Sequence, residues 1–162
     1  MFRIGSIRAY LSKISGPMLD RFDIQIELPS ISYDELSAKD SPAAEKSADV
    51  RKRVCEARAF AKERMTETDR ENSYEHSPAE KPLHCNAQLD HASIRRYCVM
   101  TDEASGLLRA AFENLGLSAR GHDRILRVAR TIADLAKSKV IQAEHIAEAI
   151  QLRSLDRKYW GE

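Results

Sequence analysis

The sequence has no long apolar run and almost no net charge. None of its 162 residues lies in a stretch approaching the about 18 apolar residues that a membrane-spanning helix needs, and no apolar segment follows Met1. We therefore expect a cytoplasmic protein with no membrane partner. The formal net charge of +1 gives no overall basic field, so any contact with nucleic acid has to rest on a local cluster of cations.

Cysteine is scarce, with Cys55, Cys85 and Cys98 as the only thiols. An odd number of cysteines behind no secretory signal argues against a disulfide framework, so reduced thiols are expected. A zinc site would have to use His84, Cys85, His91 and Cys98, but no Cys-x-x-Cys or His-x-x-x-His pair is present. No bound metal is predicted for this chain.

A phosphate-binding loop is also missing. Gly116 and Gly121 have the glycine spacing of such a loop, but His122 and Asp123 stand where it requires lysine and a hydroxyl residue. No acidic pair follows a buried strand to hold magnesium. We therefore expect that this chain alone does not hydrolyse ATP.

Near the start of the chain, Ile24, Ile26 and Leu28 alternate with polar residues before Pro29, which predicts one short strand. A single strand has no neighbour with which to pair its backbone. Its sheet partners are therefore expected in sequence outside this chain.

The rest of the sequence predicts helices. After a polar connection, Ser47 is placed to cap a helix that reaches about Arg64, and residues 66–82 read as a long mobile loop. Four further helices with short links are expected to begin after Asn86, Thr101, Ser118 and Gln142, the first of them running to about Cys98 and the second ending at Gly116. The fold predicted is mainly α, a small bundle.

The third of these four helices has two contrasting faces. Its apolar residues fall on one side, and its arginines fall within about a third of the circumference on the other: Arg120, Arg124, Arg127 and Arg130. We expect the last three arginines to form an exposed face or an interface.

Several segments carry a family resemblance. Residues 15–23, Ser-Gly-Pro-Met-Leu-Asp-Arg-Phe-Asp, resemble the Ser-Gly-Pro-Leu-Leu-Asp-Arg-Ile-Asp segment of magnesium-chelatase-like AAA+ ATPases of the ComM/YifB competence type. Residues 45–58, 86–89, 117–135 and 145–151 look like segments of that family's helical lid. The sequence departs from the family in Met18 and Phe22, in a variable insert at 66–82, and in lacking the cysteine-bearing stretch that often precedes the first motif.

The resemblance implies a domain organisation. Residues 1–30 would form the C-terminal end of an AAA+ core with its last strand, 31–46 a linker, and 47–162 the helical lid domain with a mobile loop at about 66–82. The fold class would then be an AAA+ C-terminal helical lid bundle preceded by one strand left over from the core sheet.

It also implies two site residues. Arg21 is similar to the arginine finger that acts in trans on a neighbouring subunit's nucleotide, and a structural pairing with Asp20 or Asp23 is the alternative. Arg120 is similar to sensor 2, which contacts the terminal phosphate of ATP, and a solvated side chain is the alternative. Arg21 is the expected catalytic residue and Arg120 the expected cofactor-binding one.

The resemblance further implies cofactors and partners for the intact protein. ATP and Mg²⁺ would bind to a missing AAA+ core that carries the P-loop, with no cofactor expected for this chain alone. Identical subunits would assemble into a ring, expected to be a hexamer, that acts as an ATP-driven motor on DNA in natural transformation or recombination. Magnesium insertion is not implied by these residues.

Two other functions stay open. One is a free-standing nucleic-acid-binding module. It would use a cluster of cations on one helix, whose positive charge Glu56 and Glu63 reduce: Arg51, Lys52, Arg53, Arg58, Lys62 and Arg64. No aromatic residues interleave with them to stack bases. The other is a purely structural oligomerisation segment.

Overall fold

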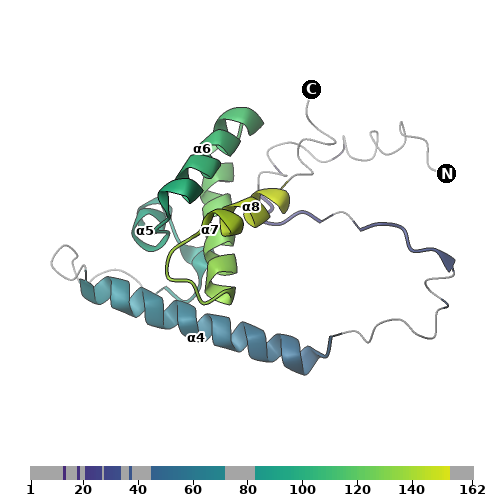
Figure 1. Ribbon diagram of the computed structural model, residues 1–162, viewed down its shortest axis with the longest axis horizontal. Coiled ribbons are helices and arrows are strands. Elements are labelled where there is room, and N and C mark those ends of the chain that lie inside the picture. Colours follow the sequence, from purple (N-terminus) through teal and green to yellow (C-terminus); the bar gives the residue numbers. More distant parts are fainter. Residues whose placement is uncertain are drawn as a thin grey trace.

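A computed structural model describes residues 13, 18, 21–26, 28–33, 37, 45–71 and 83–153 of the chain. The described part is mainly helical, as predicted (Figure 1). Its elements are, in order, α4 (Ser47–Glu71), the short 3-10 helix η1 (Asn86–Gln88), α5 (His91–Tyr97), α6 (Asp102–Leu115), α7 (Ala119–Leu135) and α8 (Ala143–Gln151).

Helix α7 is the centre of the bundle. It packs against α8, α4, α5 and η1, and α6 packs against α8. The apolar side of α7 supplies Ile125, Ala129 and Ala133, which are completely buried, and α8 adds Ile146. Helix α4 is longer than the others and extends well past the bundle at its N-terminal end (Figure 1).

Three of the predicted helix boundaries are confirmed by capping contacts. The Thr101 hydroxyl accepts a hydrogen bond from the Ala104 amide at the start of α6, and the Ser118 hydroxyl accepts one from the Gly121 amide, 3.0 Å away, at the start of α7. Gly116 ends α6 in the left-handed conformation, with φ of 59°. These signals are local, so they can be recognised without the tertiary fold.

The predicted helix from Asn86 to Cys98 is wrong in its beginning. The chain makes η1 first, and Asp90 then caps α5 by accepting a hydrogen bond from the Ser93 amide. Asn86 does not cap, because its side-chain amide is buried and donates to Asp134, 2.8 Å away.

Helix α4 continues to Glu71, so residues 66–71 are not part of a loop as predicted. The hydroxyls of Thr66 and Thr68 donate to carbonyls four residues earlier, and Asp69 pairs with Arg96 of α5 at 2.9 Å. Tertiary contacts thus extend the helix through a polar sequence. The other residues of the predicted loop, 72–82, lie outside the described residues.

The predicted strand at 24–28 is not paired. Its described residues have no regular secondary structure, and the one β-bridge in the part of the chain that is described joins Met100 to Ile141. Ile24, Ile26 and Leu28 are exposed. A strand forms only when its backbone pairs with a neighbouring strand, and none of the described residues pairs with this segment in a β-ladder.

Candidate functional site

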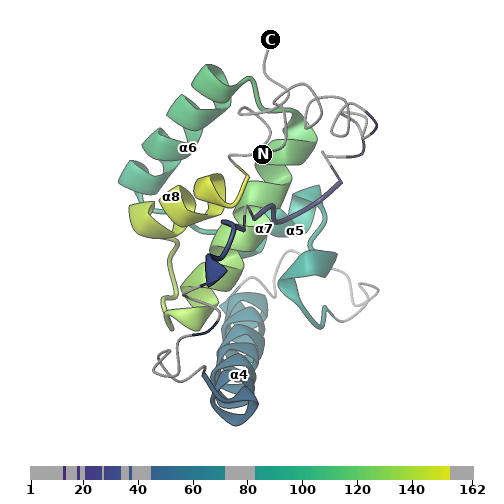
Figure 2. The ribbon, with the colours of Figure 1, turned by 90° about the vertical axis from the view of Figure 1, so that its right-hand side faces the viewer.

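Arg21 lies at the start of an extended segment that runs beside the bundle. Its amide donates to the Met18 carbonyl, 3.0 Å away, and its side chain is exposed. The following residues pass close to α7 and the end of α8 in both views (Figures 1 and 2). We call residues 21–26 the finger segment.

The finger segment is fastened to the bundle at three points. The Asp23 carboxylate forms an ion pair with the Arg124 guanidinium of α7. Arg153, just after α8, donates from Nη1 to the Phe22 carbonyl at 2.6 Å, and the Gln25 amide donates to the Leu152 carbonyl at 2.7 Å. The segment is therefore attached to both α7 and the end of α8.

Arg120 lies in the first turn of α7 and is exposed. It precedes Arg124 by four residues, so the two side chains are neighbours on one face of the helix. The structure thus connects both predicted site residues to α7: Arg120 directly, and Arg21 through Asp23 and Arg124. The roles of Arg21 and Arg120 stay predictions.

The expectation that Arg124, Arg127 and Arg130 form an exposed face or an interface is wrong for Arg130. Its side chain is fully buried, and it donates to the carbonyls of Lys139 and Ser138 at 2.9 and 2.5 Å. The chain after α7 folds back over this position, which the helical period of α7 alone does not reveal. Burial lowers the pKa of Arg130, and the nearby Asp134 carboxylate opposes that shift.

Arg130 belongs to a buried polar network that the sequence did not predict. Arg64 of α4 donates from Nε and Nη2 to the two Asp134 carboxylate oxygens at 2.9 and 3.2 Å, and from Nη1 to the Tyr97 carbonyl. Asn86 donates to the same carboxylate, and Arg130 lies 3.0 Å from it. We call Arg64, Asn86, Arg130 and Asp134 the buried network; it holds α4, η1 and α7 together.

One signal in the sequence points to the position of Arg64. It lies seven residues after Ala57, two helical turns along the apolar side of α4, and next to buried Met65. An arginine in that position suggests a buried partner. The identity of the partner, 70 residues further along the chain, depends on the fold.

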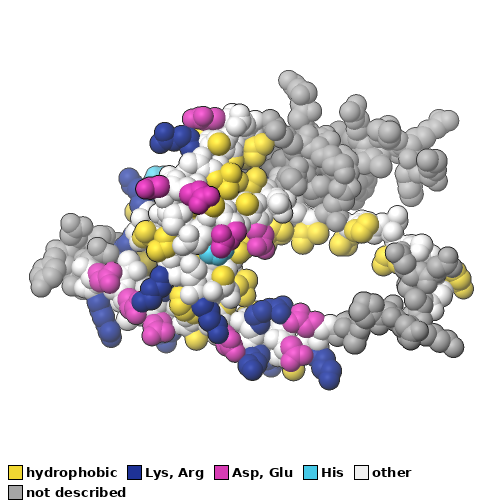
Figure 3. All heavy atoms as spheres, viewed as in Figure 1, with side chains coloured by type: hydrophobic (Ala, Val, Ile, Leu, Met, Phe, Trp, Pro, Cys, Tyr) yellow, Lys and Arg dark blue, Asp and Glu magenta, His cyan; other side chains and the backbone are white. Residues whose placement is uncertain are grey.

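The cations of α4 are interspersed with carboxylates (Figure 3). Arg53 pairs with Glu45 in two contacts, the longer 3.1 Å, while Glu56 and Glu67 hold Lys137 and Lys139 at 2.9 and 2.6 Å. Arg64 is buried, so it does not belong to the basic face proposed for nucleic acid. The helix presents mixed charge.

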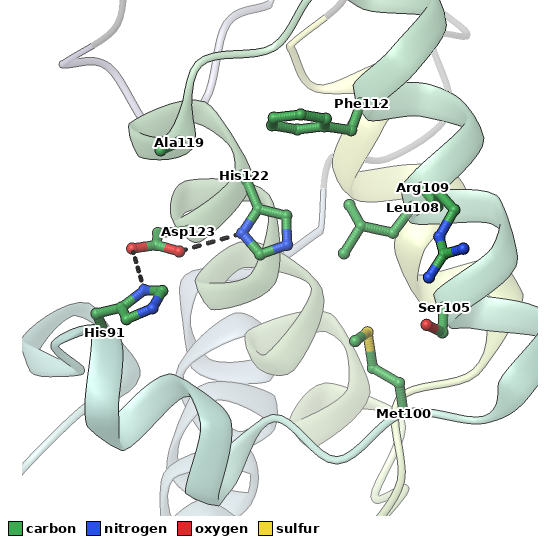
Figure 4. A pocket seen from close by; sticks show the side chains of 9 residues that line it. All are labelled: His91, Met100, Ser105, Leu108, Arg109, Phe112, Ala119, His122 and Asp123. Atoms are coloured by element: carbon green, nitrogen blue, oxygen red, sulfur yellow. Dashed lines mark hydrogen bonds and ion pairs between the residues drawn. The ribbon is translucent and has the colours of Figure 1, made fainter.

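A pocket of about 410 Å³ opens between α5, α6 and α7 (Figure 4). On one side Asp123 lies between His91 and His122, with ring nitrogens 3.3 and 3.1 Å from its two oxygens. The Phe112 ring meets the His122 ring edge-on at 6.1 Å. Ala119, the residue before Arg120, is part of the pocket lining, but neither Arg21 nor Arg120 lines the pocket.

Two further expectations concern metals and membranes. Among the described residues, no group of three or more His, Cys, Asp or Glu side chains is placed to hold a metal ion. Within the same part of the chain, no helix is both long and apolar enough to cross a bilayer.

The mainly helical bundle is that of a helical lid domain, and family models match the chain. The C-terminal model of the magnesium chelatase subunit ChlI matches residues 44–153, and a second model of subunit ChlI matches residues 2–36. The chain belongs to the magnesium chelatase ChlI C-terminal family.

Curated relatives extend this assignment. The chain is 39% identical over 148 residues to the uncharacterized protein YifB of Escherichia coli, covering 91% of this chain and 26% of that protein. It is 36% identical over 151 residues to the competence protein ComM of Haemophilus influenzae, covering 93% of this chain and 26% of that protein. The chain thus spans about a quarter of the length of the curated relatives it matches.

Proposed function

We propose that this chain is the nucleotide-sensing and oligomerisation region of a magnesium-chelatase-like AAA+ ATPase. Arg21 acts as an arginine finger on the ATP of a neighbouring subunit, and Arg120 acts as sensor 2. The observation that carries the proposal is that both exposed arginines are connected to one helix, α7, in a chain of the ChlI family.

The chemistry of the two side chains fits these roles. A guanidinium is planar, always charged and suited to the oxygens of a phosphoryl group, whose negative charge it stabilises during transfer. Arg120 lies at the N-terminal end of α7, where free amides and the helix dipole already favour an anion. When bound in the P-loop core, ATP with Mg²⁺ supplies the phosphoryl group; this chain supplies cations.

The wider role follows from the relatives. We propose that the intact protein forms a ring of identical subunits, expected to be a hexamer in the cytoplasm. One relative carries the name competence protein, so the intact motor is proposed to act on DNA during natural transformation or recombination. The mixed charge of α4 gives no reason to assign the DNA contact to that helix.

ATP turnover by the complete AAA+ protein, meaning this chain joined to its P-loop core, tests the site residues. Arg21→Ala is expected to lower kcat on the order of 10²-fold or more, and Arg21→Lys to restore little of it because lysine lacks the bidentate geometry. Arg120→Ala is expected to make ATP turnover respond less strongly to the ATP concentration.

Arg95→Ala, on the exposed end of α5, is the matched control and is expected to leave turnover unchanged. If both Arg21→Ala and Arg120→Ala turned over ATP like the unmodified protein, the proposal would be wrong. A purely structural oligomerisation segment would then be the better account.

A further inference from the structure

We propose that Arg124 and Arg153 are positioning residues for Arg21: they clamp the finger segment onto the lid, so that Arg21 moves together with the helix that carries Arg120. This inference rests on the proposed function, because it assigns the clamp a task in the same site. Neither arginine contacts the nucleotide in this account.

The first part of the clamp is the ion pair between Asp23 and Arg124. The Arg124 side chain is only 17% exposed, and it belongs to the helix face that the sequence predicts to be exposed or part of an interface. Its guanidinium is held by a carboxylate 101 residues earlier in the chain. A contact that joins such distant residues fixes the finger segment relative to α7.

The second part consists of two hydrogen bonds that involve the backbone of the finger segment. Arg153 is 4% exposed, and its buried guanidinium donates to the Phe22 carbonyl at 2.6 Å. The Gln25 amide donates to the Leu152 carbonyl at 2.7 Å. The bond from Arg153 has a charged donor, and such hydrogen bonds are the stronger ones. The two bonds lie on either side of Asp23.

The apolar side chain of Ile24 faces the same part of the bundle and is half exposed. Ile24 lines a groove of about 330 Å³ whose other walls include Val128 and Ile132 of α7 and Leu152 after α8. The finger segment therefore faces the same two elements to which its polar groups bind. An extended segment without a strand partner is held in place by the lid.

The path between the two site residues is short. Arg21 precedes Asp23 by two residues, which span at most about 7 Å of backbone, and Arg120 precedes Arg124 by four helical residues, a rise of about 6 Å. A shift of α7 when Arg120 loses its phosphate contact would therefore carry Arg21 with it. The clamp would couple the nucleotide that Arg120 contacts to hydrolysis at the site that Arg21 serves.

Charge reversal tests the clamp without any ATPase assay. In this chain, Arg124→Asp places a second negative charge beside Asp23, and Asp23→Arg places a second positive charge beside Arg124. Each single variant is expected to lower the hydrogen-exchange protection of the Gln25 amide at least tenfold, and the double variant to restore it. Arg95→Asp on α5 is the control and is expected to leave that protection unchanged.

Circular dichroism first establishes that each variant keeps its helices. If a reversal unfolds the chain, Asp23→Asn and Arg124→Lys replace it: the first is expected to lose protection, and the second to keep it. Unchanged protection in Arg124→Asp or Asp23→Asn overturns the clamp. So does a double variant that stays as unprotected as the singles.

In the complete AAA+ protein, Arg124→Asp is expected to lower kcat at least tenfold while changing the KM for ATP less than twofold, with recovery in the double variant. A merely structural loss would change KM as well and would not be rescued. If Arg21→Ala is fully active while the exchange results hold, the proposed function fails but the attachment stands. If Arg21→Ala is inactive while Arg124→Asp keeps full kcat, the clamp has no positioning role and the inference is overturned.

Discussion

Arg64 of α4 and Asp134 of α7 form a buried, two-point contact, with Nε and Nη2 lying 2.9 and 3.2 Å from the two carboxylate oxygens. Their side chains are 5% and 3% exposed. The contact holds a helix that otherwise projects from the bundle against the central helix. The position of α4 therefore depends on a charged pair more than on a broad apolar face.

Removing one member of this pair is expected to be costly. Asp134→Ala leaves Arg64 and Arg130 buried without their shared carboxylate, so we expect a loss of about 3–5 kcal/mol in the free energy of unfolding. Urea denaturation of the chain measures this. Arg51→Ala, an exposed cation on the same helix, is the control at less than about 0.5 kcal/mol. A loss for Asp134→Ala as small as that of the control would mean that the buried network does not stabilise the fold.

Two glycines of the α6 region should respond in opposite directions to alanine. Gly106 is exposed inside α6 with nothing within 4 Å of an added Cβ, so Gly106→Ala is expected to stabilise by about 0.5–1 kcal/mol. Gly116 has φ of 59°, which alanine adopts at a cost, so Gly116→Ala is expected to destabilise by about 1 kcal/mol. Melting curves of both variants check this, and a Gly116→Ala variant that melts no lower than the unmodified chain would contradict the capping account.

The thiol of Cys98 should be hidden and should resist ionisation. Burial raises the pKa of Cys98 from 9.0 to about 11. At about pH 8 we expect Cys55 and Cys85, which are exposed, to react with a thiol reagent, and Cys98 to react only after unfolding. Rapid modification of all three thiols in the folded chain would contradict the packing described.

The same shift gives a pH dependence of stability. The folded-state pKa of Cys98 lies above the unfolded value, so the neutral thiol favours the fold below about pH 9, and this contribution is lost as the pH rises toward about 11. The difference in unfolding free energy between the unmodified chain and Cys98→Ala is expected to shrink across that interval. A difference that stays constant from about pH 8 to 11 would show that the thiol titrates alike in both states.

The isolated chain should not bind DNA through α4. Among its cations, Arg53 is paired with Glu45 and Arg64 is buried against Asp134. The helix also carries carboxylates between the others, among them Glu56, Glu63 and Glu67. We expect no salt-dependent binding of a fluorescent duplex at low ionic strength. Tight binding that weakened steeply with salt and was lost in Arg51→Ala would revive the nucleic-acid-binding module.

Sequence reasoning succeeded where the signal was local. Thr101, Gly116 and Ser118 mark helix ends through contacts with residues three or four positions away, and the structure confirms each. The mainly α fold and the family followed from segments that could be read directly.

It failed where the partner is distant. The sequence places Arg64 on a basic surface and Asn86 at a helix cap, because only the fold shows that both contact Asp134. The end of α4 was missed because Asp69 is held by Arg96 of another helix. The finger segment was predicted, but its attachment through Arg124 and Arg153 depends on contacts across more than a hundred residues.

The central claim is that Arg21 acts on a neighbouring subunit's nucleotide, and a subunit-mixing experiment tests it most directly. Arg21→Ala subunits of the complete AAA+ protein keep an intact P-loop, while subunits with a mutated P-loop lysine keep Arg21; each preparation alone is expected to be inactive. Mixed rings place the intact Arg21 beside the intact P-loop, so ATP turnover is expected to return. Mixed rings that form yet stay as inactive as either parent would contradict an arginine finger acting in trans.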